Sequence, residues 1–236
     1  MFVACGGDGT IQCLANELNS TDKIIGILPI GSGNDFAKVF GTQLSKLDFL
    51  DILVDGTPRK YDLVLVNKDA CFINTYGIGF DAVANEIASR INIPIGKFKY
   101  FYAALCSLIN LSAFELSLIV DGKSLQKYTS YMAVITNGRW EGGSFFISPD
   151  SSPVDGVIEL TIITSTKKYA LLKQIIRLIL NLKLDSKDIK RLSFKSAVIL
   201  LNNAQIAHSD GEVIHPKSRF EFKVKSESIN ILSPIN

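Results

Sequence analysis

Histidine and cysteine are scarce in this chain of 236 residues, which contains two histidines and four cysteines. Cys5, Cys13, Cys71 and Cys106 form no C-x-x-C pair, and each lies in an apolar pattern. The sequence therefore disfavours a zinc site or a disulfide framework. It predicts buried free thiols, which fit a reducing compartment such as the cytosol.

Long apolar runs and a strong charge of one sign are also absent. Residues 100–113 come closest to a membrane span, but they are fewer than the roughly 18 residues that a span needs, and Glu115 follows them. No basic region followed by an apolar stretch stands at the N-terminus, so we expect no signal peptide. A net charge of +2 is too small to indicate a nucleic-acid partner. The mean hydropathy of +0.24 is high for a soluble protein and indicates large cores or contact with a membrane surface.

The most informative feature is a pair of glycine-rich turns, GGDGT at residues 6–10 and GSGND at residues 31–35. Each follows a short apolar run and precedes a helical pattern. Glycines let the backbone approach a ligand closely, and the following helix N-terminus presents N–H groups to an anion. Two such turns in tandem, each with an aspartate, indicate a site for a nucleotide phosphate and a divalent cation. The alternative for the first is a tight turn without a ligand, and for the second a simple helix cap.

Strand and helix patterns alternate in residues 1–55 and predict part of a parallel α/β domain. Thr10 is expected to cap the first helix, whose apolar residues follow at helical spacing. A strand over residues 24–28 comes next, and helices over residues 34–40 and 44–54 follow it. Because the chain begins inside an apparent central strand, we expect βα units upstream of it, on the order of 50 residues for two units.

From residue 58 the pattern changes to strands, and Asp121-Gly122 between two of them is a strong hairpin signal. Strands are expected over residues 61–67, 71–75, 115–120, 128–136, 157–164, 196–201, 204–208, 219–224 and 229–232. Helical patterns interrupt them over residues 81–90, 97–111 and 168–182. The expected fold class is therefore α/β + β: a partial nucleotide-binding α/β domain in residues 1–57, followed by a mainly antiparallel β-sandwich domain in residues 58–236.

Carboxylates stand at further glycine-rich turns, at Asp81, at Asp155 and in the Asp210-Gly211-Glu212 element. Oxygen ligands of this kind suit Mg²⁺. Each also has a plainer interpretation: Asp81 as an acidic residue in the first turn of a helix, and the other two as hairpin turns without a ligand. We expect His208 to support the structure rather than to take part in catalysis. Arg139 either meets a phosphate or stays solvated.

The order of these elements resembles the soluble bacterial diacylglycerol kinase family, which belongs with the sphingosine and ceramide kinases. The resemblance rests on GGDGT, PxGSGNDFA, NxxGxGFDA, NGRxxGG…SPxxxxxDG and SDGE, and it runs from Gly6 to Glu212. The ordered set is far more specific than any single motif. It implies an N-terminal α/β nucleotide-binding domain, a C-terminal β-sandwich and an active site in the cleft between them.

The resemblance also implies roles for individual residues. It implies that the nucleotide is bound at Gly6, Gly7, Asp8, Gly9, Thr10, Gly31, Ser32, Gly33, Asn34 and Asp210. Asp8 would position the phosphates or their Mg²⁺. Asp35 would lie in a network near the metal, and Asp81 would face the cleft from the β domain, both as catalytic residues. Glu212 matches the proposed catalytic base, and Asp155 matches a second, structural Mg²⁺ site.

The implied activity is ATP- and Mg²⁺-dependent transfer of a phosphoryl group to a lipid hydroxyl, with diacylglycerol giving phosphatidic acid. NAD kinase, which shares GGDGT, is one alternative, and a non-catalytic lipid- or nucleotide-binding module is another. The acceptor lipid would lie at the cytoplasmic face of a membrane, with the protein bound peripherally. Apolar residues 100–111 and 169–182 either pack in the core or form a patch that meets this membrane. An exposed strand edge would allow a homodimer.

Overall fold

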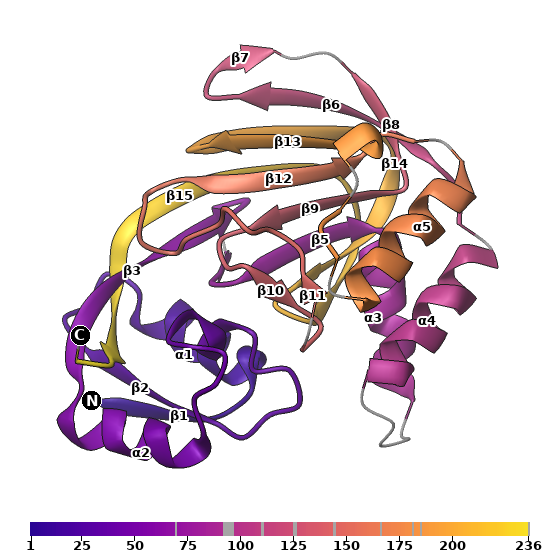
Figure 1. Ribbon diagram of the computed structural model, residues 1–236. Helices are drawn as coiled ribbons and strands as arrows, with labels where there is room; N and C mark the ends of the chain where they lie inside the picture. The colour runs from indigo at the N-terminus through magenta and orange to yellow at the C-terminus, as the bar shows by residue number, and fades with distance from the viewer. Residues whose placement is uncertain are drawn as a thin grey trace.

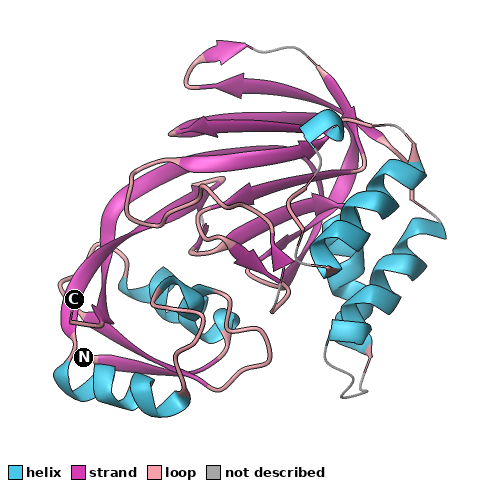
Figure 2. Cartoon of the chain, in the orientation of Figure 1, coloured by secondary structure: helices cyan, strands magenta, loops and turns pink. Residues whose placement is uncertain are grey.

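The computed structural model describes the whole chain except residues 69, 92–96, 110, 125–126, 144, 166, 181, 185 and 236. A small α/β part contains both ends of the chain, and a long, curved sheet extends from it (Figure 1). Further helices stand together beside the far end of this sheet (Figure 2).

The helices are α1 (Asp8–Leu18), α2 (Lys46–Asp55), α3 (Phe80–Arg90), α4 (Lys97–Ile109) and α5 (Lys168–Ile179), with short 3₁₀ turns η1 (Phe36–Val39) and η2 (Ser186–Asp188). The strands are β1 (Phe2–Gly6), β2 (Ile24–Pro29), β3 (Thr57–Val66), β4 (Ala70–Phe72), β5 (Thr75–Gly79), β6 (Phe114–Val120), β7 (Lys123–Ser124), β8 (Tyr128–Ser130), β9 (Met132–Thr136), β10 (Trp140–Glu141), β11 (Phe145–Phe146), β12 (Ile158–Ile163), β13 (Ile189–Phe194), β14 (Ser196–Ser209) and β15 (Glu212–Ser233).

The C-terminal strand completes the sheet of the α/β part. β1 and β2 run parallel, and the end of β15 pairs with β2 in the same direction near Ile231. β3 pairs antiparallel with β15. Fully buried side chains, among them Ile11, Ile25, Phe36 and Leu63, form the core between this sheet and its helices. Residues from both ends of the sequence thus hold the glycine-rich turns in place.

Aromatic side chains form part of the β-sandwich core, together with many aliphatic ones. Phe72, Tyr76, Phe220 and Phe222 pack with ring centroids 5.2 to 6.4 Å apart. The main strand order is β1-β2-β15-β14-β5-β9-β12-β13, and the pairings from β15 onward are antiparallel. An α/β part followed by an antiparallel sandwich-like part confirms the expected fold class.

The helices α3, α4 and α5 cover one end of the sheet (Figure 1). Phe80 of α3, Ala104 of α4, and Leu171 and Ile175 of α5 form a separate apolar cluster with Met132 of β9. None of the helices in the described residues has the length and apolar character needed to cross a bilayer. This cluster forms one wall of the cavity described below.

Two N-terminal expectations are wrong in detail. The first helix starts earlier than expected, with Gly7 rather than Thr10 as its N-cap. The helix expected over residues 34–40 is reduced to the short turn η1. The reason is that Asn34 adopts a φ of 53°, and its side-chain amide bonds both the N–H and the carbonyl of Gly31. Asn closes a turn in this way where a longer helix would need αR backbone.

The predicted ends of some strands are also wrong. The strands expected over residues 196–201 and 204–208 are one strand, β14, whose register to β15 shifts between Leu200 and Gln205. The Asp121-Gly122 hairpin is present, with positive φ at both residues, as this turn chemistry requires.

The cysteines are less buried than expected. All four are free, but only Cys71 is buried, whereas Cys5 and Cys13 are exposed. Cys5 lies in β1, at one end of the strand order, where part of the strand is open to solvent.

The expected division of the chain at residue 57 coincides with the start of β3. This strand serves both parts, because Leu63 lies in the core of the α/β part and the adjacent Val64 in the core of the sandwich. The division into two domains therefore stays a prediction.

Phe72→Ala tests the aromatic core. Phe72 is fully buried against Tyr76 and Phe222, so its truncation should lower the free energy of unfolding by about 3–5 kcal/mol. Urea denaturation followed by circular dichroism measures this loss. The control Val154→Ala, at a side chain that is 58% exposed, should change the value by less than about 0.5 kcal/mol. Equal losses in both variants would contradict the assignment of the core.

Candidate active site

A cavity of about 490 Å³ lies between the glycine-rich turns and the β-sandwich. Its polar end is lined by both turns and by Asp81, Glu141, His208, Asp210 and Glu212. Its other end is lined by the apolar side chains of Phe80, Ala84, Ala104, Met132, Ile147, Ile163, Leu171, Ile175, Leu178 and Ile179. The volume lies within the range of roughly 300–1,000 Å³ that is typical of small-molecule sites.

The two glycine-rich turns touch each other because neither has a side chain at the contact. A Cβ on Gly31 would lie only 2.4 Å from the Cα of Gly7, so a larger residue would push the turns apart. Gly7 is also the N-cap of α1. The free N–H groups of the first turn of α1 therefore face the cavity, where a phosphate would be stabilised.

Asp8 connects the two turns. Its Oδ1 accepts a hydrogen bond from the N–H of Phe36 at 2.9 Å. Burial raises the pKa of Asp8, and the neighbouring Asp35 carboxylate raises it further. A nearby cation stabilises the charged form of a carboxylate most when that carboxylate is buried and lies beside a second negative charge. This placement fits the predicted role of Asp8 in holding a divalent ion.

Asp35 reaches across the cleft to the other part of the molecule. Its carboxylate accepts the N–H of Gly143 at 2.8 and 3.1 Å from its two oxygens, and it forms an ion pair with Lys38. The Lys38 ammonium lies 5.7 Å from the ring centre of Trp140. Asp35 thus fixes the second glycine-rich turn to the β10–β11 hairpin.

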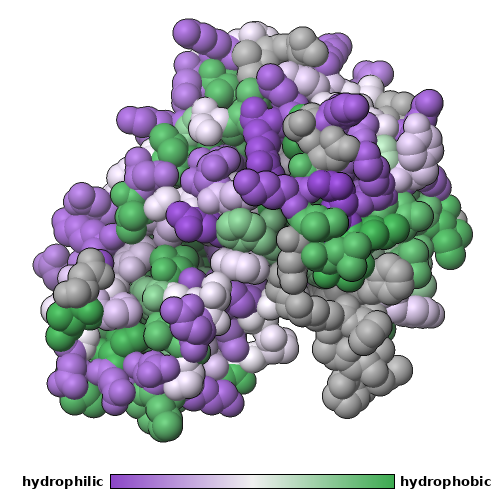
Figure 3. Space-filling model, viewed as in Figure 1, coloured by the Kyte–Doolittle hydropathy of each residue, from purple (hydrophilic) through white to green (hydrophobic). Residues whose placement is uncertain are grey.

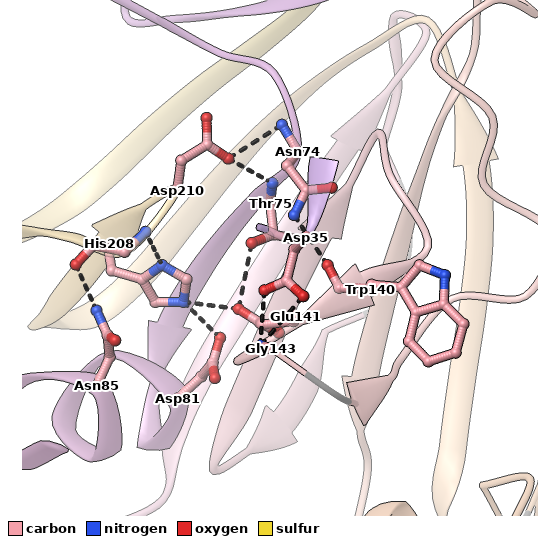
Figure 4. Close-up of polar contacts among 11 residues, drawn as sticks. Asp35, Asn74, Thr75, Asp81, Asn85, Trp140, Glu141, Gly143, His208 and Asp210 are labelled. Atoms are coloured by element: carbon pink, nitrogen blue, oxygen red, sulfur yellow. Dashed lines mark hydrogen bonds and ion pairs between the residues drawn. The ribbon is translucent and has the colours of Figure 1, made fainter. Parts of the chain in front are cut away.

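Asp81, Glu141 and His208 form a largely buried cluster (Figure 4), and all three line the cavity. His208 Nε2 lies 2.7 Å from Asp81 Oδ2 and 3.0 Å from Glu141 Oε1. Burial lowers the pKa of His208, but the two carboxylates outweigh burial and raise it to about 10. Burial and the charge of Asp81 raise the pKa of Glu141 to about 7. The Gly211 N–H, 3.4 Å from His208 Nδ1, weakly opposes protonation there.

The carboxylate of Asp210 is occupied by the protein's own backbone. It accepts the N–H groups of Ile73, Asn74 and Thr75 at 2.8 to 3.0 Å. Burial raises the pKa of Asp210 to about 7, although these three hydrogen bonds act in the opposite direction. In the structure this side chain holds the backbone of residues 73–75 in place. Its contact with the nucleotide stays a prediction.

Glu212 follows a tight turn, in which Asp210 and Gly211 have φ values of 46° and 93°. It extends toward the first glycine-rich turn, since a Cβ on Gly9 would lie 3.3 Å from Glu212 Oε1. The carboxylate therefore stands next to the N-terminus of α1, where a phosphate would bind. This position agrees with the role of base that the sequence predicts for Glu212.

Asp155 lies on an exposed turn and does not line the cavity. Its Oδ1 accepts the N–H of Val157 at 3.1 Å, and the adjacent Gly156 N–H bonds Asp62. Within the described residues, Asp81, Glu141 and His208 are the group whose ligand atoms lie close enough to share a metal ion. A metal at Asp155 stays a prediction.

Sequence reasoning missed Glu141 and the apolar end of the cavity. Glu141 was only an unspecified position in the NGRxxGG motif, and the one local sign of a function was its place directly before two glycines. The apolar end draws its residues from α3, α4, α5 and the strands β9 and β12. No local pattern indicates that these elements meet.

Family models match nearly the whole chain. Residues 1–66 match the diacylglycerol kinase catalytic domain, and residues 74–233 match the YegS C-terminal NAD kinase beta sandwich-like domain. The chain belongs to the diacylglycerol kinase/YegS family of lipid kinases. This confirms the resemblance seen in the sequence.

Curated members of this lipid kinase family are similar at moderate identity. A diacylglycerol kinase of Mycobacterium tuberculosis (strain CDC 1551 / Oshkosh) is 32% identical over 173 residues, which are 71% of this chain and 56% of that protein. A putative lipid kinase of Staphylococcus epidermidis is 29% identical over 97% of this chain and 75% of its own length. The chain spans little more than half of the M. tuberculosis protein.

Several solved structures have the same fold as this chain. A putative diacylglycerol kinase from Bacillus anthracis str. Sterne superposes with a TM-score of 0.80 at 21% identity, over 98% of this chain and 77% of that one. Yeast NADH kinase complexed with NADH gives a TM-score of 0.57 at 13% identity, over 99% of this chain and 61% of that one. At these identities the likeness shows the fold alone.

The protonated state of His208 should make stability depend on pH. Its folded pKa of about 10 lies above the unfolded value of about 6.5, so the stabilisation is complete below the unfolded value and is lost as the pH rises toward 10. Glu141, whose folded pKa of about 7 lies above its unfolded value of about 4.3, affects stability mainly between those two pH values. Between pH 7 and 10 the free energy of unfolding should therefore fall, and His208→Gln should flatten this fall.

The chain offers a matched control in its other histidine, the exposed His215. Urea denaturation at several pH values should give the same slope for His215→Gln as for the unmodified chain. If His208→Gln keeps the full slope, the ion-paired imidazolium is contradicted.

Proposed function

We propose that the chain transfers the γ-phosphate of ATP to the hydroxyl of a lipid, with diacylglycerol as the acceptor and phosphatidic acid as the product. One observation carries this proposal: the two glycine-rich turns and an apolar chamber belong to the same cavity. Phosphoryl transfer requires the donor phosphate and the acceptor hydroxyl in contact and in line. An acceptor with a hydrocarbon tail would satisfy both ends at once.

The polar end suits a nucleotide bound together with Mg²⁺. Its donors to a phosphate are the backbone N–H groups of the turns and the start of α1, and no Lys or Arg is among the described residues that line the cavity. Asp8 and its neighbours offer only oxygen ligands, which Mg²⁺ prefers. When bound, Mg²⁺ neutralises charge on the phosphates and orients them.

The chain's own residues would perform the remaining tasks. Glu212, beside the N-terminus of α1, would accept the proton of the acceptor hydroxyl as it attacks the γ-phosphate. Asp8 would hold the phosphates through their cation. Asp35, bonded to Gly143, would keep the cleft closed around the nucleotide and exclude water from the transfer.

The apolar end favours a lipid over a dinucleotide as acceptor. NADH kinase shares the fold, but a nicotinamide nucleotide has no hydrocarbon tail to fill an apolar chamber. Polar side chains also line the cavity, and Thr161 is one of them. It is 1% exposed, and its hydroxyl finds no hydrogen-bond partner in the part of the chain that the structure describes. An ester or hydroxyl group of a lipid would satisfy it.

An exposed apolar surface on α5 supports binding to the cytoplasmic face of a membrane. Figure 3 shows apolar side chains gathered over this helix. Tyr169, Ile176 and Leu180 are 67%, 44% and 61% exposed, whereas Leu171 and Ile175 of the same helix line the cavity. Basic residues interleave them in the sequence, as is typical of helices that lie on anionic membranes. The helix would thus separate the chamber from the bilayer.

A transfer assay with radiolabelled ATP, Mg²⁺ and mixed vesicles containing diacylglycerol tests the proposal. Lipid products are resolved by chromatography, and any longer form encoded in the same reading frame is assayed in parallel. Label in phosphatidic acid is the expected result. Labelled NADP⁺ in a parallel reaction with NAD⁺, without labelled lipid, would overturn the lipid assignment. Bound ATP without any labelled product would leave a binding module as the function.

Glu212→Gln should reduce lipid phosphorylation by about 10²–10⁴-fold, because the amide cannot accept the proton. The matched control is Glu115→Gln, an exposed glutamate on β6 outside the cavity, which should keep full activity. Initial rates at saturating ATP measure both. Undiminished transfer by Glu212→Gln, with circular dichroism unchanged, would remove Glu212 from the role of base.

A further inference from the structure

We infer that Asn85 is a positioning residue for Glu212, and that it acts through the backbone carbonyl of Gly211. This inference rests on the proposed function, in which Glu212 is the base, and it adds a residue that none of the sequence motifs contains. Asn85 lies in the middle of α3. Its Nδ2 donates a hydrogen bond to the carbonyl oxygen of Gly211 at 2.6 Å. The bond therefore ties α3 to the turn between β14 and β15.

The carbonyl that Asn85 holds belongs to the peptide bond between Gly211 and Glu212. The plane of this peptide sets the direction in which the Cα–Cβ bond of Glu212 leaves the backbone. Glycine restricts such a plane less than other residues do. Gly211 has a φ of 93°, and no atom beyond its chain neighbours lies within 4 Å of where its Cβ would be. A partner from outside the turn is needed to fix this peptide, and Asn85 supplies it.

The side chain of Glu212 has little else to hold it. Glu212 is exposed and lines the cavity. Its carboxylate makes no hydrogen bond or ion pair with any residue that the structure describes. A base must come within hydrogen-bond reach of the proton that it accepts. The direction of the Glu212 side chain is therefore set mainly by its backbone.

The same face of α3 also contacts the residue before the turn. Figure 4 shows Asp81 and Asn85 extending from this helix toward His208. Asp81 Oδ2 lies 2.7 Å from His208 Nε2, and His208 Nδ1 lies 3.4 Å from the backbone nitrogen of Gly211. Asp81 and Asn85 are four residues apart, so they lie on one face of the helix. One helix face thus contacts both the N–H side and the carbonyl side of Gly211.

α3 is a suitable support for a catalytic group. Its Ala82 and Ala88 are 0% and 1% exposed, and the N–H of Phe80 bonds the carbonyl of Tyr131 at 2.9 Å. The helix is therefore packed firmly against the sheet. A side chain on such an element holds its partner more precisely than a side chain on a loop.

Two substitutions of Asn85 test its role in the transfer assay. Asn85→Ala removes the donor, and Asn85→Leu removes it while keeping a side chain of similar size. Both should lower kcat by about 10–100-fold, because a base displaced by about 1 Å loses much of its effect. The KM values for ATP and for diacylglycerol should stay within about twofold of those of the unmodified chain.

The chain offers a matched control in Asn203, an exposed asparagine of β14 that is not among the described residues lining the cavity. Asn203→Ala should keep full activity. Circular dichroism and urea denaturation of each variant show whether it folds.

Combining Asn85→Ala with Glu212→Gln tests the route by which Asn85 acts. The double variant should be as active as Glu212→Gln alone, to within about twofold, because residues that act as one unit do not have additive effects. A general loss of stability or of cavity shape would instead multiply the two losses.

The outcomes separate the inference from the proposed function. Full kcat in both Asn85 variants, losses that multiply with that of Glu212→Gln, or loss of the folded state in both variants would overturn the inference while kinase activity stands. A raised KM for diacylglycerol at unchanged kcat would also overturn it, because Asn85 would then bind the acceptor. Full activity of Glu212→Gln would overturn the role of base and the inference together. No transfer by the unmodified chain would overturn the proposed function as well.

Discussion

The buried carboxylate of Asp210 sets the geometry on which the candidate site depends. Its three hydrogen bonds to the N–H groups of residues 73–75 tie the turn between β14 and β15 to the start of β5. His208 precedes this turn and Glu212 follows it. If the carboxylate were removed, three donors would be left without their acceptor, and both functional side chains would lose their common support. One structural interaction thus positions both the proposed base and the charged cluster.

The β10–β11 hairpin connects the second glycine-rich turn to His208 and its carboxylate partners. Gly143 donates its N–H to Asp35 beside the second glycine-rich turn, and Glu141, in the same hairpin, contacts His208. Close packing makes this arrangement sensitive to side-chain volume, because a Cβ on Gly77 would lie 1.9 Å from Asp81 Oδ2. A shift of the second glycine-rich turn would therefore reach the cluster of Asp81, Glu141 and His208 through a few rigid contacts rather than through the whole fold.

Local sequence predicted what local chemistry determines. Both glycine-rich turns, the Asp121-Gly122 hairpin and the change from α/β to β patterns depend on residues adjacent in the chain. Even there the cap of α1 was wrong, because Gly7 adopts extended backbone before the helix and Thr10 lies within it. Glu141 could not be assigned, since its partners come from elements far along the sequence. The full lengths of β14 and β15 were not predicted for the same reason. Pairing between these two strands extends them through residues of weak β-propensity.

Binding a polyphosphate in a cavity rich in carboxylates requires that the two ends differ in their electrostatics. At the polar end the N-terminus of α1 and the backbone of the turns supply partial positive charge without any basic side chain. The nucleotide would therefore bring its own cation, because without one its phosphates would lie against the negative charge of Asp8. At the cluster of Asp81, Glu141 and His208, a single imidazole serves two carboxylates. Since carboxylates outnumber basic side chains among the described lining residues, the cavity would favour a nucleotide that arrives with its cation over one without it.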